Sequence, residues 1–372
     1  MSEPLYHPGL EGIVAGETAV STLEGGLSYR GYQVEELAQH ASFEETAYLI
    51  LYGELPKADQ LASFNERLRH SAPVPLAAID ILRRIPPQAH MMDVMRTGAS
   101  LLAHWDPDQN SNDHDANLRK AERLIAQLPV IMAARHRLVQ GKEPVLPDRH
   151  YSLAENLLRM LRRRDPSPAA VRALEVSLIM YAEHEFNAST FSARVVASTL
   201  SDLHSAVTAA IGALKGPLHG GANERALAVL DQVGSPDKAE AWIHEALARK
   251  ERIMGFGHRI YKQGDPRAKF LKPMCVQLAK ETGNTDMEEL ADTIERIVIA
   301  EKKMYPNVDW PTARLYHHLG LPVDLYTPLF VVSRVTGWSA HIIEQLDHNR
   351  LIRPLARYNG SQPRSWIPLT QR

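Results

Sequence analysis

Apolar residues recur every three to four positions along most of this chain, and this spacing limits its fold more than any other feature of the sequence. In the segment 285–304 (TDMEELADTIERIVIAEKKM), one helical stripe carries Leu290, Ile294, Ile297 and Val298. Thr285 and Glu288 have the spacing of a capping box at the start of that helix. The pattern therefore predicts a mainly α fold.

Other segments repeat the helical signal, whereas evidence for strands is confined to the start of the chain. The segment 42–56 (SFEETAYLILYGELP) begins with the capping residue Ser42 and ends at Gly53 and Pro56. The segment 201–216 (SDLHSAVTAAIGALKG) is nearly apolar on every side, which predicts a buried helix or a helix at a subunit interface. Only the stretch 9–26 is suited to one or two short hairpins.

Length and charge bound the class of protein. A chain of 372 residues is longer than one core usually accommodates, so two domains are expected. The 42 basic and 44 acidic residues give a formal net charge of −2, which argues against nucleic-acid or membrane-surface binding driven by bulk charge. The single cysteine, Cys275, excludes an intramolecular disulfide and a cysteine-based metal site. The lack of a signal-peptide pattern and of a long apolar run favours a soluble, cytoplasmic protein.

Several common catalytic motifs are missing. His184 and Glu185 are followed by Phe, Asn and Ala, so the zinc-binding pattern HExxH is not completed. The stretch GFGHRI (255–260) is not a dinucleotide-binding GxGxxG, because position 260 is Ile. Neither a P-loop nor a GxSxG elbow occurs. These absences argue against most hydrolases, dehydrogenases and NTPases.

Imidazole, carboxylate and guanidinium groups gather in a few short stretches from residue 181 onward. YAEHEFNASTF, GPLHGGANE and MGFGHRIYKQGDPRA contain His184, His219 and His258. YPNVDWP contains Asp309, and arginines stand nearby in the sequence at Arg267, Arg334 and Arg353. In a nearly neutral chain, an anionic substrate requires a local arginine cluster of this kind, because guanidinium groups bind carboxylates in a bidentate manner.

Each of these residues has a purely structural explanation when it is taken alone. Asp309 lies two positions before Pro311 and is suited to starting a helix. His258 is suited to bonding the backbone of a turn, and His184 to a satisfied place in the core. Arg267 fits a surface ion pair, as arginines of this type often do. A catalytic or binding role is favoured over these structural explanations only because all the stretches occur together in one chain.

These stretches resemble the citrate synthase family. Residues 255–267 (GFGHRIYKQGDPR) fit the signature of that family at every defined position, and GPLHGGA, PNVD and IRP occur in the family's order. The resemblance covers essentially the whole chain, in the short bacterial form without an extra N-terminal domain. It implies a mainly α, two-domain fold, with a large helical domain of residues 1–221 plus 315–372 and a small mobile domain of residues 222–314.

The resemblance also implies a reaction, the condensation of acetyl-CoA with oxaloacetate to citryl-CoA, which is hydrolysed to citrate and CoA. His219 would polarise the thioester carbonyl, Asp309 would take a proton from the methyl carbon, and His258 would protonate the oxaloacetate carbonyl oxygen. The implied oxaloacetate ligands are His184, Arg267, Arg334 and, from the partner in a homodimer, Arg353. The implied CoA contacts are Gly255, Phe256, Gly257 and Lys262. No metal or redox cofactor is implied, and acetyl-CoA is a co-substrate.

Elementary chemistry agrees with this assignment. A thioester is a weak carbon acid, so a carboxylate must remove its proton while a donor stabilises the enolate oxygen. His219 precedes the predicted helix start at ANERALAVL, and a helix N-terminus disfavours an imidazolium. We therefore expect His219 to be neutral and to donate a hydrogen bond. The glycines around it allow the CoA chain to approach the backbone closely.

Two other functions stay open. YAEHEFNASTF, MDVMRTG and the Trp after Asp309 also look like 2-methylcitrate synthases, which use propionyl-CoA. A hydrophobic pocket separates substrates that differ by one methylene by only about 10–200-fold, and we place this pocket near Phe186 and Trp310. A non-catalytic module that binds CoA or carboxylates would retain the arginines but lose the acid–base set, and that set is present here.

Overall fold

The computed structural model describes residues 6–258 and 261–372, and these residues form sixteen α-helices and one small sheet. The first eight helices are α1 (Val34–His40), α2 (Phe43–Tyr52), α3 (Ala58–Ser71), α4 (Leu76–Arg84), α5 (Met91–Leu102), α6 (His114–Val139), α7 (Leu153–Arg162) and α8 (Pro168–Tyr181). The other eight are α9 (Ala188–Ser198), α10 (Leu203–Leu214), α11 (Ala222–Val233), α12 (Pro236–Ala248), α13 (Pro266–Thr282), α14 (Asp286–Lys302), α15 (Asp309–His318) and α16 (Tyr326–Asp347). The mainly α prediction is confirmed.

Helix α2 begins and ends where its sequence predicts. The Ser42 hydroxyl accepts from the Glu45 N–H at 3.1 Å, and the Glu45 carboxylate accepts from the Ser42 N–H at 3.3 Å. The helix ends at Gly53, which has a φ of 89° that favours glycine. Both termini are therefore determined by local signals.

The capping box predicted for α14 is wrong. Thr285 makes no side-chain cap to the helix. Glu288 instead accepts from Nε of Arg314 at 3.0 Å and lies 3.0 Å from Nε2 of His318. Arg314 is fully buried, so its charge needs a carboxylate more than the helix end needs a second cap. Contacts of Glu288 with residues of α15 thus take the place of the predicted capping box.

The sheet is small and antiparallel, with strands β1 (Ser21–Thr22), β2 (Ser28–Tyr29) and β3 (Tyr32–Gln33) in that order. Only β1 lies in the stretch expected to form hairpins; the other two strands follow directly after it. The register pairs Ser21 with Tyr29 and Tyr29 with Tyr32. The Tyr29 hydroxyl donates to the Ile179 carbonyl at 3.0 Å, which ties the sheet to the end of α8.

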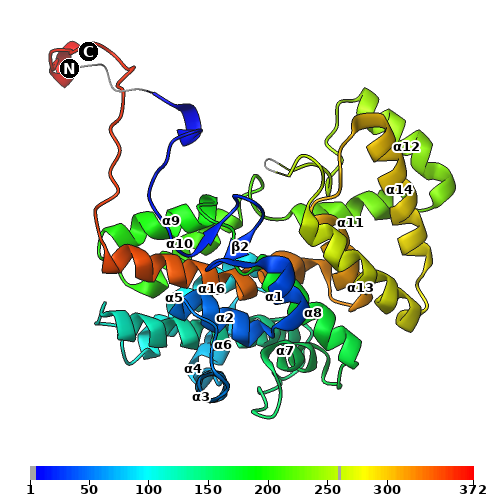
Figure 1. Ribbon diagram of the computed structural model, residues 1–372. Helices are drawn as coiled ribbons and strands as arrows, with labels where there is room; N and C mark the ends of the chain where they lie inside the picture. Colours follow the sequence, from blue (N-terminus) through cyan, green and yellow to red (C-terminus); the bar gives the residue numbers. More distant parts are fainter. Residues whose placement is uncertain (1–5, 259–260) are drawn as a thin grey trace.

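Helix α16 runs through the larger group of helices and packs against α6, α9, α10 and α8 (Figure 1). Nearly all of its residues are buried, including the polar Arg334, Thr336, Ser339 and His341. A helix buried on all sides with charged groups must meet polar partners inside the protein. The apolar segment 201–216 forms α10, which packs against α9, α5 and α16 as a largely buried helix.

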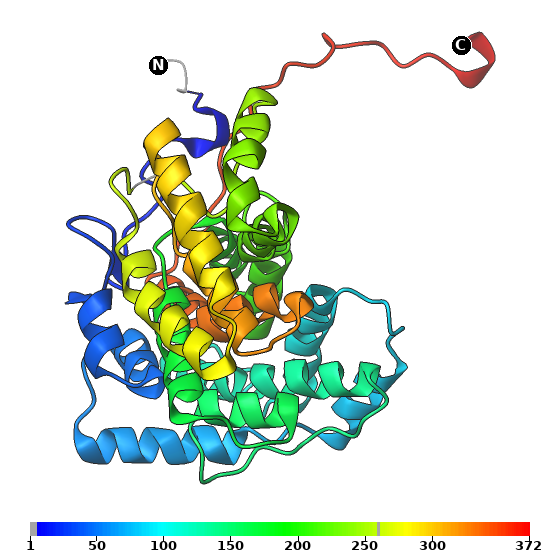
Figure 2. The same ribbon diagram turned by 90° about the vertical axis from the view of Figure 1, so that its right-hand side faces the viewer.

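Helices α11 to α14 gather on one side of the molecule (Figures 1 and 2). Helix α12 packs on α14, α11 packs on α15, and α13 packs on α15 and α8. This group corresponds to the predicted small domain of residues 222–314. The predicted end at 314 falls inside α15, which continues to His318. The division into two domains that move against each other stays a prediction.

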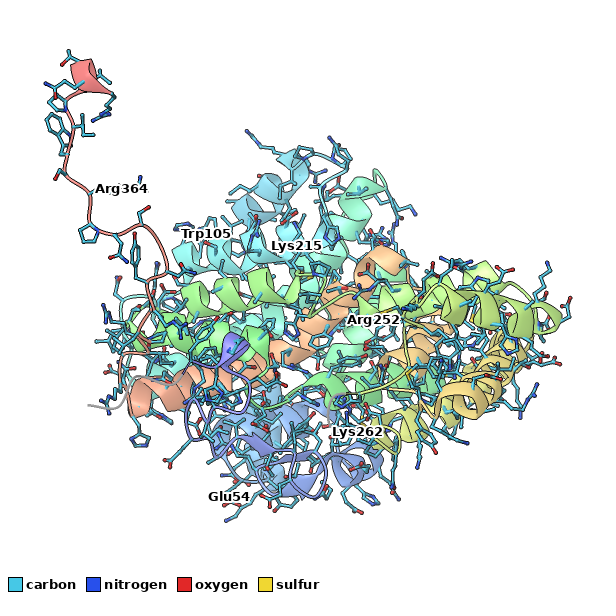
Figure 3. All side chains as sticks on the ribbon, turned by 90° about the horizontal axis from the view of Figure 1, so that it is seen from above. Glu54, Trp105, Lys215, Arg252, Lys262 and Arg364 are labelled. Atoms are coloured by element: carbon cyan, nitrogen blue, oxygen red, sulfur yellow. The ribbon has the colours of Figure 1, made fainter. Side chains whose placement is uncertain are left out.

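The C-terminal segment leaves the body after α16. Residues 348–372 run outward in extended conformation to a short 3₁₀ turn at Leu369–Gln371 (Figures 1 and 2). Figure 3 shows Arg364 on this segment, away from the helices. The segment exposes large apolar side chains, with Leu355 77%, Tyr358 79% and Trp366 76% accessible.

Candidate active site

The loop that carries His219 joins α10 to α11 and depends on its glycines. A Cβ at Gly220 would lie 2.2 Å from the Leu214 carbonyl oxygen, so only glycine fits at that position. Gly221 adopts a φ of 73° and is the N-cap of α11. The His219 N–H donates to the Gly216 carbonyl at 2.9 Å, which closes the turn. The loop holds the imidazole in one place.

His219 is neutral and carries its proton on Nδ1. The Ser189 backbone N–H donates to Nε2 at 3.2 Å, so Nε2 is the unprotonated acceptor. The Ser189 hydroxyl lies 2.8 Å from the same nitrogen and also accepts from Nε1 of Trp338 at 3.0 Å. Burial, and next the charge of Arg334, lower the pKa of His219 to about 4. The helix N-terminus predicts a neutral His219 from the sequence, and in the structure burial is the largest cause of its lowered pKa.

His184 and His258 lie together, with ring centroids 5.8 Å apart. Burial, then Arg267 and Arg334, hold the pKa of His184 well below its usual value. Its Nε2 is buried and has no hydrogen-bond partner among the described residues. Burial followed by Arg267 also lowers the pKa of His258, whose Nδ1 accepts from the Tyr261 N–H at 3.2 Å. Both rings are therefore neutral, and His258 carries its proton on Nε2.

Two of the three predicted arginines are buried beside these histidines. Arg267 is 3% exposed and makes a two-bond contact with Asp265, from Nε at 3.0 Å and from Nη2 at 2.9 Å. Arg334 is 2% exposed, and its Nε donates to the Tyr181 carbonyl at 2.6 Å. A surface ion pair was the alternative explanation for Arg267, but its pair is buried. Buried guanidinium groups beside neutral imidazoles form a site that suits an anion.

Asp309 is the first residue of α15 and lies at the same site. Its N–H donates to the Asn307 side chain at 3.0 Å, and its Oδ1 accepts from the Tyr181 hydroxyl at 2.7 Å. Burial is the largest cause that raises the pKa of this carboxyl above its ordinary value. Asp309 does begin a helix, as the structural explanation required. Its carboxylate, however, makes no cap to that helix and faces Tyr181.

The loop of His258 and the segment before Asp309 are bonded to each other. The Gly257 N–H donates to the Tyr305 carbonyl at 2.8 Å, and the Asn307 N–H donates to the Gly255 carbonyl at 2.9 Å. The Asn307 side chain adds a bond to the Gly257 carbonyl at 3.0 Å. A Cβ at Gly255 would lie 2.7 Å from the Trp310 ring, so the close contact requires glycine. His258 and Asp309 therefore belong to one unit.

A cavity of about 720 Å³ opens beside His219 and His258. Its basic lining residues are Arg225, Lys250, Arg252 and Lys302, and its apolar lining residues include Ile253, Met254, Phe256 and Met304. A volume of this size, with apolar walls and a few cations, suits an elongated ligand that carries phosphates. The lining includes the predicted CoA contacts Gly255, Phe256 and Gly257.

Lys262 does not line this cavity. Its Nζ donates to the His258 carbonyl at 3.4 Å instead. Arg252, which does line the cavity, and Lys262 are both labelled in Figure 3. Sequence reasoning did not select Arg225, Lys250, Arg252 or Lys302, because lone basic residues on helices and turns carry no distinctive pattern.

Arg353 is not brought to the site within one chain. It is exposed at the start of the C-terminal segment. Its neighbour Ile352 donates its N–H to the Ser198 hydroxyl at 3.1 Å. This bond attaches the start of the C-terminal segment to the end of α9.

Neither residue expected to shape the acyl pocket lines the cavity. Trp310 is fully buried, donates to Glu295 at 2.9 Å and packs on Phe256 at 4.8 Å between ring centroids. Phe186 packs against Arg194 and His341 instead. The placement of the acyl pocket near these two residues stays a prediction.

Within the described residues, no group of three or more histidine, cysteine, aspartate or glutamate side chains is arranged to hold a metal ion. No helix in the same part of the chain has the length and apolar character needed to cross a bilayer.

The fold and the site define a mainly helical enzyme with acid–base groups and buried arginines around a cavity. The family model "Citrate synthase, C-terminal domain" matches residues 9–355. The chain belongs to the citrate synthase family and is a transferase. The family resemblance predicted from the motifs is confirmed.

Similar proteins cover almost the whole chain. Citrate synthase 2 of Bacillus subtilis (strain 168) is 47% identical over 366 residues, which cover 98% of each protein. 2-Methylcitrate synthase 2 of Corynebacterium glutamicum is 45% identical over 372 residues, which cover 98% of this chain and 97% of that protein.

Solved structures of citrate synthases share the fold. The Pyrobaculum aerophilum enzyme matches with a TM-score of 0.92 at 38% identity, covering 98% of this chain and 95% of that one. The Thermoplasma acidophilum enzyme, solved as a ternary complex with carboxymethyl coenzyme A and oxaloacetate, matches with a TM-score of 0.91 at 35% identity and covers 98% of both chains.

Proposed function

We propose that this protein condenses acetyl-CoA with oxaloacetate and releases citrate and CoA. One observation carries the proposal: neutral His219 and His258 line one cavity, and Asp309 is bonded through Asn307 to the loop of His258. The solved relative that holds carboxymethyl coenzyme A and oxaloacetate together supports this pair of substrates.

The first step is the removal of a proton. In the proposal, the Asp309 carboxylate takes a proton from the acetyl methyl group while His219 donates its Nδ1–H to the thioester oxygen. The Ser189 N–H on Nε2 leaves that proton no other place on the ring. A carboxyl with a raised pKa is a stronger base than an ordinary aspartate, which suits a weak carbon acid.

The second step forms the carbon–carbon bond. The enolate carbon attacks the keto carbon of oxaloacetate, and the keto oxygen takes the Nε2 proton of His258. Water then cleaves the thioester of citryl-CoA, which gives citrate and the CoA thiol. We propose that the reaction uses no metal or redox cofactor, because the carboxylate and the two imidazoles supply every proton transfer that it needs.

Oxaloacetate would lie between His184, Arg267 and Arg334. The unpartnered Nε2 of His184 supports this placement, since a buried polar atom without a partner needs a ligand. The Asp265 carboxylate accepts from Nε and Nη2 of Arg267, and the Met180 carbonyl accepts from Nη1 at 3.5 Å, so the second N–H of Nη1 and of Nη2 would be left for substrate.

We propose a homodimer in which Arg353 completes the site of the partner. The support is that Arg353 lies apart from the site of its own chain, on an extended segment with exposed apolar side chains. A second copy is the occupant that would cover this segment. The proposal further includes a cytoplasmic location, which the single, buried Cys275 supports because it needs no oxidising compartment.

Closure of the small domain would bring Asp309 opposite His219 and exclude water from the enolate. Small-angle scattering with oxaloacetate and carboxymethyl coenzyme A is expected to show a smaller radius of gyration than the free protein. An unchanged radius of gyration would contradict closure.

A second candidate is 2-methylcitrate synthase, which the 45% identity to the Corynebacterium glutamicum enzyme favours. The test is the release of CoA thiol from acetyl-CoA and from propionyl-CoA in parallel, each with oxaloacetate. A kcat/KM for acetyl-CoA about tenfold or more above that for propionyl-CoA is expected. Comparable or faster turnover of propionyl-CoA would instead establish the second candidate.

Asp309→Ala separates an enzyme from a binding module. The variant is expected to lose turnover and to keep oxaloacetate binding, measured by calorimetry. Wild-type protein that binds both substrates but releases no thiol from either acyl-CoA would contradict the catalytic proposal.

A further inference from the structure

Tyr181, the first residue of the stretch YAEHEFNASTF, contacts the proposed base, although the sequence assigns no role to it. It is the last residue of α8, is 2% exposed, and its hydroxyl donates to Oδ1 of Asp309 at 2.7 Å. Asp309 lies 128 positions further along the chain and is carried by α15. The contact therefore exists only because the fold brings α8 against the start of α15.

We propose that Tyr181 is the positioning residue of the proton abstraction, holding one oxygen of the Asp309 carboxylate so that the other oxygen receives the proton. The inference rests on the proposed role of Asp309 as the base. Among the described residues, Oδ1 accepts from Tyr181 and no hydrogen bond reaches Oδ2. A carboxylate fixed through one oxygen has a defined orientation, which proton transfer from carbon requires.

Tyr181 is itself firmly held. Its ring packs on Phe330 of α16 with centroids 4.7 Å apart and planes at 61°. The same Phe330 lies 4.6 Å beneath the guanidinium of Arg334, whose Nε donates to the Tyr181 carbonyl at 2.6 Å. One residue thus contacts a proposed oxaloacetate arginine through its backbone and the proposed base through its side chain. Removing the hydroxyl leaves the backbone contact in place.

The hydrogen bond from the Tyr181 hydroxyl and the burial of Asp309 have opposite effects on the pKa of Asp309. Burial raises the pKa of Asp309, and the Tyr181 hydrogen bond is the largest influence that lowers it. The charged groups that face the carboxylate from the packed helices are Arg267 and Asp265 at the start of α13 and Arg225 on α11. Burial also keeps the pKa of Tyr181 well above its usual value, so its hydroxyl remains a donor at neutral pH.

The chain offers a matched control in Tyr316 on α15. This tyrosine is 1% exposed, and its hydroxyl lies 3.2 Å from the Ser177 hydroxyl rather than at the Asp309 carboxylate. A Tyr→Phe change removes one buried hydroxyl in either case, so both variants test the general cost of such a loss. Only the change at Tyr181 removes a bond to the base.

The experiment is a pH profile of kcat/KM for Tyr181→Phe, Tyr316→Phe and the wild type. The Tyr181 variant is expected to lose roughly tenfold or more in kcat, because it loses a charge-assisted hydrogen bond. Its acid limb is expected to move to higher pH by about one unit, since the protonated carboxyl is no longer disfavoured. Oxaloacetate affinity should stay within about twofold of wild type, and Tyr316→Phe should leave the limb in place.

The inference would be overturned if a folded Tyr181→Phe variant kept the acid limb of its kcat/KM profile at the wild-type pH and had the same kcat as Tyr316→Phe. Adding Tyr181→Phe to Asp309→Asn gives a second readout, because the hydroxyl should have no further effect once the carboxylate is gone. If Asp309→Asn itself retained turnover, the proposed function would fail. If Asp309→Asn were inactive and Tyr181→Phe were silent, only the role of Tyr181 would fail.

Discussion

The backbone N–H of Ser189 points at Nε2 of His219 from 3.2 Å, and this contact decides which ring nitrogen carries the proton. Ser189 is the second residue of α9, whose N-cap Asn187 accepts from the Ser189 hydroxyl at 2.7 Å. The free N–H groups of a helix start are good donors, so the start of α9 fixes the tautomer of His219.

His219→Ala is therefore expected to lower kcat by roughly 10²–10³-fold, the loss typical of one preorganised donor to a developing oxyanion. Thiol release under saturating substrates measures it. The half-buried His317, which lies 3.4 Å from the Asn284 amide and away from the cavity, provides the control. Equal activities of His219→Ala and His317→Ala would contradict the role of His219.

The basic lining of the cavity predicts where CoA affinity resides. Arg252→Ala is expected to raise the KM for acetyl-CoA roughly tenfold, because a guanidinium–phosphate contact is charge-assisted. Lys262→Ala should leave that KM near the wild-type value, since Lys262 bonds to the His258 carbonyl and does not line the cavity. A larger rise in the KM for acetyl-CoA at Lys262→Ala than at Arg252→Ala would instead support Lys262 as a CoA contact, as the family resemblance implies.

Mixing two inactive variants tests whether Arg353 acts in the partner. Asp309→Ala and Arg353→Ala chains, co-expressed, should form mixed dimers in which one site has both residues intact. Random mixing then restores roughly a quarter of wild-type turnover, because half of the dimers hold one working site of two. Inactive mixed dimers, isolated with two affinity tags, would show that Arg353 serves its own chain or none.

His204 predicts a loss of stability in acid. It is 1% exposed on α10, and burial lowers its pKa to about 4 despite the nearby Asp106 at 3.5 Å. Between about pH 4 and 6.5 the unfolded chain binds the proton and the folded chain does not, so the free energy of unfolding falls as pH decreases through that window. From pH 7 to 5 this histidine costs about 1–2 kcal/mol.

Urea unfolding at both pH values checks this. His204→Asn should lose less stability than wild type on acidification, whereas substitution of the exposed His244 should leave the pH dependence unchanged. Identical pH dependence in all three proteins would contradict the prediction.

The features that the sequence predicted best are those determined by residues close together in the chain. The helical period identified the fold class, and Ser42 and Gly53 mark the two ends of α2. Each of the catalytic candidates His219, His258 and Asp309 stands in a short motif. These motifs can be recognised in the sequence because they contain glycines, such as Gly220 and Gly255, at positions where a larger residue does not fit.

What could not be predicted depends on contacts between distant segments. Tyr181 meets Asp309 across 128 positions, and Glu288 bonds to Arg314 instead of capping its own helix. Phe186 packs on Arg194 of α9, and Trp310 donates to Glu295 of α14, contacts that depend on how the helices pack. A pattern along the chain gives no information on which of several neighbours a side chain will face.

The hydrogen bonds between residues 255–257 and 305–307 join a proton donor and a proton acceptor that are separated by 51 positions in the sequence, His258 and Asp309. If the small domain of residues 222–314 moves as predicted, these two groups would move as a pair. Their mutual spacing is thus set when the chain folds, whereas movement of the predicted small domain would change their distances to groups of the predicted large domain, such as His219, Tyr181 and His184. The predicted closure would therefore bring two groups that are already positioned relative to each other, the proposed donor and the proposed base, toward His219 in one movement.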